Sequence, residues 1–432
     1  MCVGAVRVVL PTFQAQSLVD NGFVAVEGLL DELIVSAPLS VVEDAGEFLA
    51  AQSYAEGGLI TGIPYFDIVL GVLVAIYLTV TPGVLLGAFD AYLFTPLDIL
   101  LQKKIKEEDI KLVGRLGSGT FGDVYDATLG NSERRVVVKK CKGSKEAAEL
   151  QETEEWMNRR LRRSLFLAKG AAPYLGSYTA AGGRVGASRA SVLVWDYKGS
   201  STLEALMVQR GFPLILEEEM FGSPQRGSTE QREQRIVQRI MQQVLTALSE
   251  LHGTGIVHRD VKPSNLVLMD GKFKLVDFGA ATDLRIGKNY VPDLSLLDPS
   301  YCPPEQYVMP EDTPVPPPAP VAAALSPLLW QLNRPDLFDT YSAGLIMLQL
   351  SIPNLRTKNA LLPTGIFQRN LRLSEYDLKK WREDFTGPTW DFSLLDQRGG
   401  FDLAASLVCS RNTLRRGRAS ASVALLHPFL LL

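Results

Sequence analysis

The longest apolar stretch of the chain lies between Asp67 and Asp90, where IVLGVLVAIYLTVTPGVLLGAF runs for 22 residues without a charge. As a helix rising about 1.5 Å per residue it would be roughly 33 Å long, which matches the hydrocarbon core of a bilayer. A buried helix of a soluble domain is the alternative, although such helices seldom stay uncharged for so long. The pattern predicts one transmembrane helix over 67–90, kinked at Pro82.

The charges on the two sides of this stretch predict its orientation. Residues 1–57 hold one basic and eight acidic residues, and no targeting segment is recognisable among them. Three lysines follow the helix: Lys103, Lys104 and Lys106. Because basic residues stay on the cytoplasm-equivalent side, the C-terminal body is expected there, with an N-terminal segment 1–66 on the far side. A juxtamembrane segment 91–108 joins the two, and its apolar part, 91–101, is expected at the interface or against the following domain.

Alternating apolar and polar residues begin at Ile110, in IKLVGRLGSGTFGDVYDATLG, and RRVVVKK continues the extended pattern. The motif GxGxxG is a weak signal alone, because dinucleotide-binding folds use it before a helix. Here a second strand follows, as a glycine-rich hairpin folded over phosphates requires. The predicted nucleotide-binding residues of this hairpin are Leu116, Gly117, Ser118, Gly119, Thr120, Phe121, Gly122, Asp123 and Val124.

A lysine and a carboxylate are expected to complete the phosphate site. Lys139 ends the β-branched run VVVK, so its ammonium group can emerge from a buried strand, whereas Lys140 faces the other way. The helical pattern over 145–163 offers Glu154 as the carboxylate that orients this lysine, with Glu155 as the alternative.

The run SVLVW predicts a strand that ends at a connector between two lobes. Backbone groups of Asp196 and Tyr197 are expected to hydrogen-bond adenine. Trp195 would then stand at the back of the pocket, and the alternative is a core tryptophan that contacts no ligand.

Two further motifs carry candidate catalytic chemistry: HRDVKPSN begins at His258, and DFG begins at Asp277. Asp260 can accept the proton of a substrate hydroxyl, and Lys262 can neutralise γ-phosphoryl oxygens. Asn265 and Asp277 offer the hard oxygen ligands that Mg²⁺ prefers. His258 is expected to support the loop rather than act as a base.

The composition bears on which partners and which structural sites are expected. With 46% hydrophobic residues the 432-residue chain can build sizeable cores, and its net charge of −4 gives no basic surface, so nucleic acid is not expected as a partner. The four cysteines form no CxxC pair and the three histidines have no metal-ligand spacing. Neither a disulfide framework nor a zinc site is therefore predicted.

In order, spacing and residue type these motifs resemble the eukaryotic protein kinases over residues 109–430, and Lys262 with Pro263 is similar to the serine/threonine subclass. The resemblance implies an α+β fold with ATP and Mg²⁺ at the site. It implies an antiparallel N-lobe with one helix over 109–195 and a mainly helical C-lobe over 196–430. Val137 takes the place of the family's alanine over adenine. Every charged position needed for turnover is present, which favours an active kinase.

The resemblance continues beyond the catalytic motifs. Glu305 in YCPPEQY matches the end of the activation segment, with Arg418 as its partner, and Asp339 matches the helix that anchors the catalytic loop. A proline-rich insertion, 308–335, lies between them. Because its two flanks belong to one domain, TPVPPPAP is not an interdomain linker. The apolar residues that follow it predict a docked surface element; they are Leu325, Leu328, Leu329, Trp330 and Leu332.

This insertion, with VWDYKGSSTLEALM, YDLKKWRE and one span, is similar to the thylakoid state-transition kinases of plants and green algae. The resemblance implies a single-pass chloroplast thylakoid protein with segment 1–66 in the lumen and the kinase domain in the stroma. Its protein substrates would be stroma-exposed threonines of photosystem II core or light-harvesting proteins. The antenna-directed branch carries a lumenal cysteine pair, and residues 3–66 contain no cysteine. The core-directed branch is therefore expected. The antenna branch, a nucleotide-binding scaffold and a receptor-type kinase are the alternatives.

Overall fold

The computed structural model describes residues 65–101, 105–119, 122–130, 134–164, 169–185, 188–288, 298–310, 313, 315–357, 359–411 and 417–431. Predictions on segment 1–64 and on Lys103, Lys104, Thr120 and Phe121 lie outside these residues. The chain divides into two compact units, Met1–Val72 and Leu73–Leu432. The described part of the first unit, 65–72, is helical and begins α4 (Tyr65–Thr79).

The kink predicted at Pro82 is a break, so residues 67–90 do not form the single helix that the sequence predicts. Helix α4 ends at Thr79, and the chain turns at Pro82, which lacks an N–H donor, and Gly83, whose φ is 77°. Three helical pieces then follow without a gap: α5 (Val84–Phe89), the π-helical turn η1 (Asp90–Phe94) and α6 (Thr95–Leu101). Among the described residues no single helix is long and apolar enough to cross a membrane. Ile68–Thr79 and Val84–Asp98 meet that criterion only as a pair bent by 55°.

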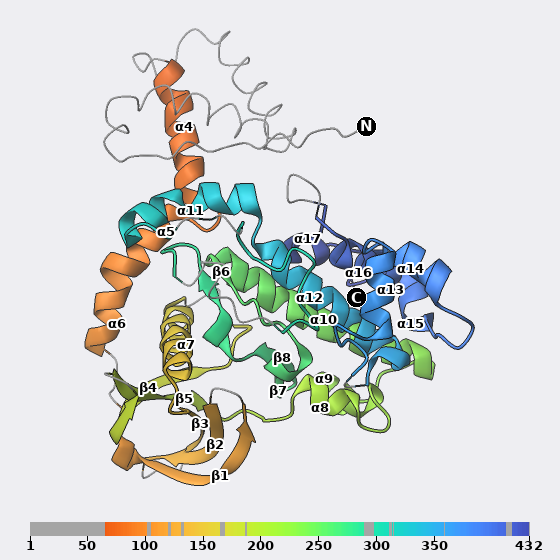
Figure 1. Cartoon of the computed structure of the whole chain (residues 1–432), viewed down its shortest axis with the longest axis horizontal. Helices are drawn as coiled ribbons and strands as arrows, with labels where there is room; N and C mark the ends of the chain where they lie inside the picture. The colour runs from red at the N-terminus through yellow and green to blue at the C-terminus, as the bar shows by residue number, and fades with distance from the viewer. Residues whose placement is uncertain are drawn as a thin grey trace. The chain divides into compact units, whose positions relative to one another are not determined.

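The N-lobe is a five-stranded antiparallel sheet in the order β1-β2-β3-β5-β4, with one helix packed on it (Figure 1). Its elements are β1 (Ile110–Ser118), β2 (Gly122–Leu129), β3 (Arg134–Cys141), α7 (Lys145–Arg163), β4 (Tyr174–Val185) and β5 (Ser188–Asp196). Because side chains alternate along β3, Val136 and Val138 are buried in the lobe's core, which leaves Val137 and Lys139 on the opposite face. Ser144 caps the N-terminus of helix α7, and its hydroxyl accepts a hydrogen bond from the N–H of Ala147 at 3.1 Å.

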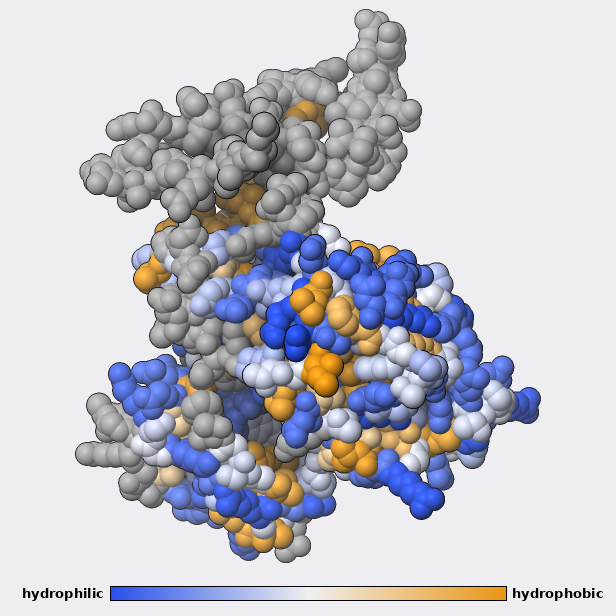
Figure 2. Space-filling view, turned by 45° about the vertical axis from the view of Figure 1, so that its right-hand side comes forward, coloured by the Kyte–Doolittle hydropathy of each residue, from blue (hydrophilic) through white to orange (hydrophobic). Residues whose placement is uncertain are grey.

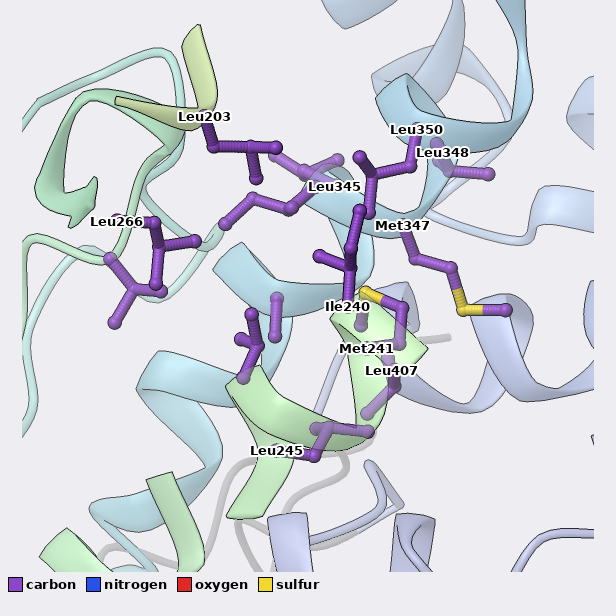
Figure 3. Close-up of a cluster of buried hydrophobic side chains, with 14 of the residues drawn as sticks. Leu203, Ile240, Met241, Leu245, Leu266, Leu345, Met347, Leu348, Leu350 and Leu407 are labelled. Carbon is purple, nitrogen blue, oxygen red and sulfur yellow. The ribbon is translucent and has the colours of Figure 1, made fainter. Parts of the chain in front are cut away.

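The C-lobe is built around two helices, α10 and α12, and its largest core cluster joins them to α8, α16 and the strands of the catalytic region (Figure 3). All sixteen residues of α12 are buried. The helices are α8 (Leu203–Met207), α9 (Glu217–Phe221), α10 (Thr229–Gly253), α11 (Ala319–Asn333), α12 (Asp336–Ser351), α13 (Ile366–Leu373), α14 (Leu378–Phe385), α15 (Ser393–Asp396), α16 (Gly400–Val408) and α17 (Ala421–Ala424). Two short strand pairs hold the catalytic segments: β6 (Ile256–Val257) with β9 (Thr282–Asp283), and β7 (Leu266–Met269) with β8 (Lys272–Leu275).

The insertion between the activation segment and α12 docks on the C-lobe through α11. Trp330 is buried in a cluster with Val257, Leu284 and Phe338, and Leu329 packs against the same cluster. Two of the residues expected to pack, Leu325 and Leu332, are exposed instead. The helix therefore uses one face for the contact and leaves an apolar face in solvent.

Candidate active site

A cavity of about 620 Å³ lies between the two lobes, and its mouth is visible as the hollow at the lower left of Figure 2. Most of the predicted site residues line it. They are Leu116, Gly117, Gly119, Gly122, Val124, Val137, Lys139, Glu154, Asp196, Asp260, Lys262, Asn265 and Asp277. Ser118, Asp123 and Tyr197 are described but do not line the cavity.

The glycine-rich hairpin joins β1 to β2 above the cavity. The N–H of Gly119 donates to the carbonyl of Gly122 at 2.9 Å, which closes the hairpin. A Cβ at Gly122 would lie 3.0 Å from the Lys140 carbonyl oxygen, so a side chain there would push the strands apart. Ser118 donates to Asp123 at 2.7 Å. These two predicted nucleotide contacts thus hold the hairpin together.

Lys139 joins the lobes through two carboxylates. Its Nζ lies 2.7 Å from Glu154 Oε2 on α7 and 2.8 Å from Asp277 Oδ1. Burial alone would lower the pKa of Lys139, but these two carboxylates outweigh it and raise the pKa. Burial raises the pKa of Glu154 to about 7, although Lys139 opposes the shift. The alternative carboxylate, Glu155, instead accepts hydrogen bonds from serines of β4 and β5.

The catalytic loop brings Asp260, Lys262 and Asn265 together. Asp260 Oδ1 lies 2.9 Å from Lys262 Nζ, and Asp260 Oδ2 accepts a bond from Asn265 Nδ2 at 2.8 Å. Burial raises the pKa of Asp260, and Lys262 acts in the opposite direction. Lys262 also contacts Asp298 at 3.3 Å. The sequence did not identify Asp298, because this residue lies 36 residues after Lys262 and outside the quoted motifs.

Asp339 of α12 holds the catalytic loop in place. Its carboxylate accepts bonds from the backbone N–H groups of His258 and Arg259, both at 2.8 Å, and contacts His252 Nε2 at 2.8 Å. The ring of His258 packs 4.8 Å from that of Phe278, and its Nε2 lies 3.1 Å from the Val276 carbonyl oxygen. These contacts fit a supporting role for His258.

The adenine end of the cavity differs in part from the expectation. The N–H groups of Asp196 and Tyr197 already donate to the carbonyls of Pro173 and Arg135, so they are not available as adenine donors. The ring of Tyr197 faces the Arg135 guanidinium at 3.7 Å. Trp195 lines the cavity and also donates to Asn158 Oδ1 on α7 at 3.1 Å.

Several apolar lining residues were missed, among them Ala172, Val267 and Met269. Val267 and Met269 are alternate residues of the strand LVLM that follows Asn265. Because side chains alternate along a strand, both face the same side, and that pattern could have identified them.

The residues present fit a magnesium ion. Asn265 uses its amide nitrogen to bond Asp260, so its oxygen is available as a ligand. Asp277 supplies a carboxylate, and a φ of 64° holds this residue in the left-handed region. An amide oxygen and a carboxylate are ligands of the hard type that Mg²⁺ takes, with phosphates and water completing its shell.

A second ion pair joins the end of the activation segment to the C-lobe. Arg418 Nη1 lies 2.8 Å from Glu305 Oε1, and Arg411 Nη1 lies 3.5 Å from the same oxygen. The side chain of Arg418 is wholly buried, and its Nη1 also donates to the carbonyl of Leu337 in α12 at 2.7 Å, so Arg418 links the segment to α12.

Comparison with known proteins agrees with the chemistry of the site. Residues 110–315 match the protein kinase domain family. The chain is 46% identical over 389 residues to the chloroplastic serine/threonine-protein kinase STN8 of Arabidopsis thaliana, covering 82% of this chain and 78% of that one. It is 39% identical over 412 residues to the chloroplastic kinase STN7 of the same plant, covering 91% and 70%.

A solved structure is also similar. The crystal structure of a Stt7 homologue from Micromonas algae, soaked with ATP, has a TM-score of 0.65 and 31% identity over 77% of this chain and 95% of that one. The chain is a protein serine/threonine kinase, and it belongs to the family that includes STN8 and STN7.

Proposed function

We propose that the chain is a membrane-anchored chloroplast kinase that transfers the γ-phosphoryl group of ATP to stroma-exposed threonines of photosystem II core proteins. The observation that carries the chemistry is the meeting of Lys139, Glu154 and Asp277 with Asp260, Lys262 and Asn265 around one cavity. Family membership supports the compartment.

Each residue has a stated task in this proposal. Lys139, held by Glu154, neutralises the α- and β-phosphates, and Lys262 neutralises the transferred group. Asp260 accepts the proton of the substrate threonine as its hydroxyl oxygen attacks phosphorus and the bond to the β-phosphate oxygen breaks. Asn265 and Asp277 would hold Mg²⁺, which neutralises charge on the phosphates. A scaffold without turnover would not require Asp260 and Lys262 in contact.

Two observations support the core-directed branch over the antenna-directed one. Residues 3–66 contain no cysteine, whereas the antenna branch carries a lumenal pair. The chain is also more similar to STN8 than to STN7.

Two observations support anchoring of the chain in the membrane: the apolar run between Asp67 and Asp90, and the exposure of apolar side chains in this region. Among the described residues of 73–101, large apolar side chains such as Val74, Ile76, Phe89 and Leu100 are exposed. Such a surface is costly in water and favourable in lipid. The bent pair of helices therefore supports a membrane contact of this segment, with the kinase domain in the stroma.

The experiment uses the full chain in detergent, mixed with thylakoid membranes and labelled ATP. We expect label in threonines of photosystem II core proteins, at least about tenfold more per mole than in antenna proteins, and none above background with Asp260→Asn. Preferential labelling of antenna proteins would assign the chain to the other branch. Equal labelling by wild type and Asp260→Asn would refute the catalytic assignment.

A further inference from the structure

The segment that follows the Pro82 turn lies along the C-terminal half of α7 (Figure 1). Asp90 binds Arg163 through two bonds of 2.9 and 3.1 Å. Asp98 binds Arg162 through two bonds of 2.7 and 2.8 Å. Two acids spaced eight residues apart therefore hold two adjacent arginines of the helix that carries Glu154.

These pairs are largely withdrawn from water. The side chain of Arg163 is 7% exposed, that of Asp90 is 17% exposed and that of Asp98 is 19% exposed. Asp90 also lies 3.8 Å from Arg160, whose side chain is buried and pairs with Asp283. Burial and the neighbouring Arg285 lower the pKa of Arg160, whereas Asp90 opposes the shift. The segment thus supplies negative charge that a buried arginine cluster requires.

The segment also packs closely against Arg285 and Gly255 of the kinase domain. The carbonyl of Pro82 accepts a bond from Arg285 Nε at 2.9 Å. A Cβ at Gly87 would lie 2.7 Å from Arg285 Cδ, and a Cβ at Gly255 would lie 2.5 Å from Pro82 Cβ. Glycine at these two positions is what allows the backbone to approach.

Apolar burial does not account for this docking. Phe89, Leu93, Leu97 and Leu100 of the same segment are exposed, while the acids face the kinase domain. A helix held by the hydrophobic effect would show the reverse arrangement. Charge pairing therefore determines where the segment sits on α7.

We propose that Asp90 and Asp98 are positioning residues for phosphoryl transfer, which hold α7 so that Glu154 reaches Lys139. Glu154 lies eight residues before Arg162 on one continuous helix, about 12 Å along its axis. Movement of the C-terminal end of α7 therefore displaces Glu154, and with it the ammonium group that faces the phosphates. The proposal concerns turnover itself and does not depend on which thylakoid protein is the substrate.

The test is a charge exchange in the full chain in detergent, with casein as a generic substrate. Asp98→Arg and Arg162→Asp alone should each lower kcat about tenfold or more, with the Kd of ATP changed less than about threefold. The double variant should recover kcat to within about threefold of wild type. Asp402→Arg, which breaks the exposed C-lobe pair with Lys379, is the matched control and should leave kcat unchanged.

The proposal is overturned if either single reversal keeps wild-type kcat, or if the double variant is no more active than the singles while it melts like wild type. If the reversals do not fold, Asp98→Asn decides: a threefold or greater loss of kcat at unchanged Tm, restored in Asp98→Glu, supports positioning, and an unchanged kcat overturns it. Wild-type turnover of casein is the reference for every variant. Failure on thylakoid targets alone would concern the substrate assignment and not the positioning residues.

Discussion

Replacing Asp339 tests whether the catalytic loop is positioned from α12. This carboxylate is fully buried and accepts bonds from the backbone N–H groups of His258 and Arg259, both at 2.8 Å. Arg259 has a φ of 67°, a region that a residue with a side chain rarely adopts. The loop therefore needs an external contact to keep the conformation that presents Asp260.

The expected magnitude follows from these contacts. A hydrogen bond to a charged group contributes about 1.5–3 kcal/mol, and a buried donor left unpaired costs about 1–3 kcal/mol. Asp339→Ala leaves two buried N–H groups unpaired, so we expect a loss of about 3–6 kcal/mol of unfolding free energy. It also removes the carboxylate that opposes the lowered pKa of Arg259, which burial brings to about 10. Asp339→Asn keeps one oxygen and should lose about half as much as Asp339→Ala.

The loss of kcat tests this role of Asp339 more directly than the loss of unfolding free energy does. If Asp260 shifts by about 1 Å, kcat should fall about 100-fold in Asp339→Asn even where the protein remains folded. Guanidinium unfolding and kcat would be measured on the same preparations. Asp336→Asn is the matched control, because this buried carboxylate of the same helix pairs with Arg334 and not with the loop. A folded Asp339→Asn with kcat within threefold of wild type would show that the loop is held by other contacts.

Three further predictions follow from the site. Glu305→Gln should lower the unfolding free energy by about 3 kcal/mol, because it leaves the buried guanidinium of Arg418 without its ion pair; a change below about 1 kcal/mol in chemical denaturation would contradict this. Because the raised pKa of Glu154 is about 7, its carboxylate gains a proton as the pH falls through 7. The ion pair with Lys139 is then lost, so kcat should fall between pH 8 and pH 6, and Glu154→Gln should lack this limb; identical profiles would disprove the assignment. Trp195→Ala should lower the KM for ATP analogues enlarged at the adenine N6, since this indole lines the cavity; no change relative to wild type would place it away from the base.

The polar residues of the site could be predicted from the sequence because the chemistry of phosphoryl transfer determines their types. Asp260, Asn265 and Asp277 stand in short motifs whose neighbours are also constrained, and the structure brings them to one cavity. Glu154 was distinguishable from Glu155 only by spacing. The final choice depends on which side of α7 faces β3, and the ion pair of 2.7 Å with Lys139 shows it.

Contacts at strand ends were less predictable. Tyr197 and Asp123 stand beside lining residues, but a strand's alternation decides which side chains face the cavity, and the sequence does not determine where that alternation ends. At Pro82 the sequence predicts a kink but not that the helix ends before it, for a different reason. Hydropathy sums apolar residues whatever the backbone does, whereas the turn depends on one missing N–H donor and on Gly83 with a φ of 77°.

The arginines of α7 show why a charge pattern cannot be interpreted from one segment alone. In the sequence, RRLRR at the end of an amphipathic helix is typical of a solvated face. The side chains of Arg160 and Arg163 are buried in the structure, because Asp90 comes from a largely apolar stretch about 70 residues earlier. Neither segment shows its role alone. The arginines of α7 explain why Asp90 and Asp98 interrupt an apolar run, and these two acids explain why the arginines can be buried. A candidate membrane segment with regularly spaced acids should therefore be tested against basic helices of the domain that follows it before its charges are assigned to the lipid interface.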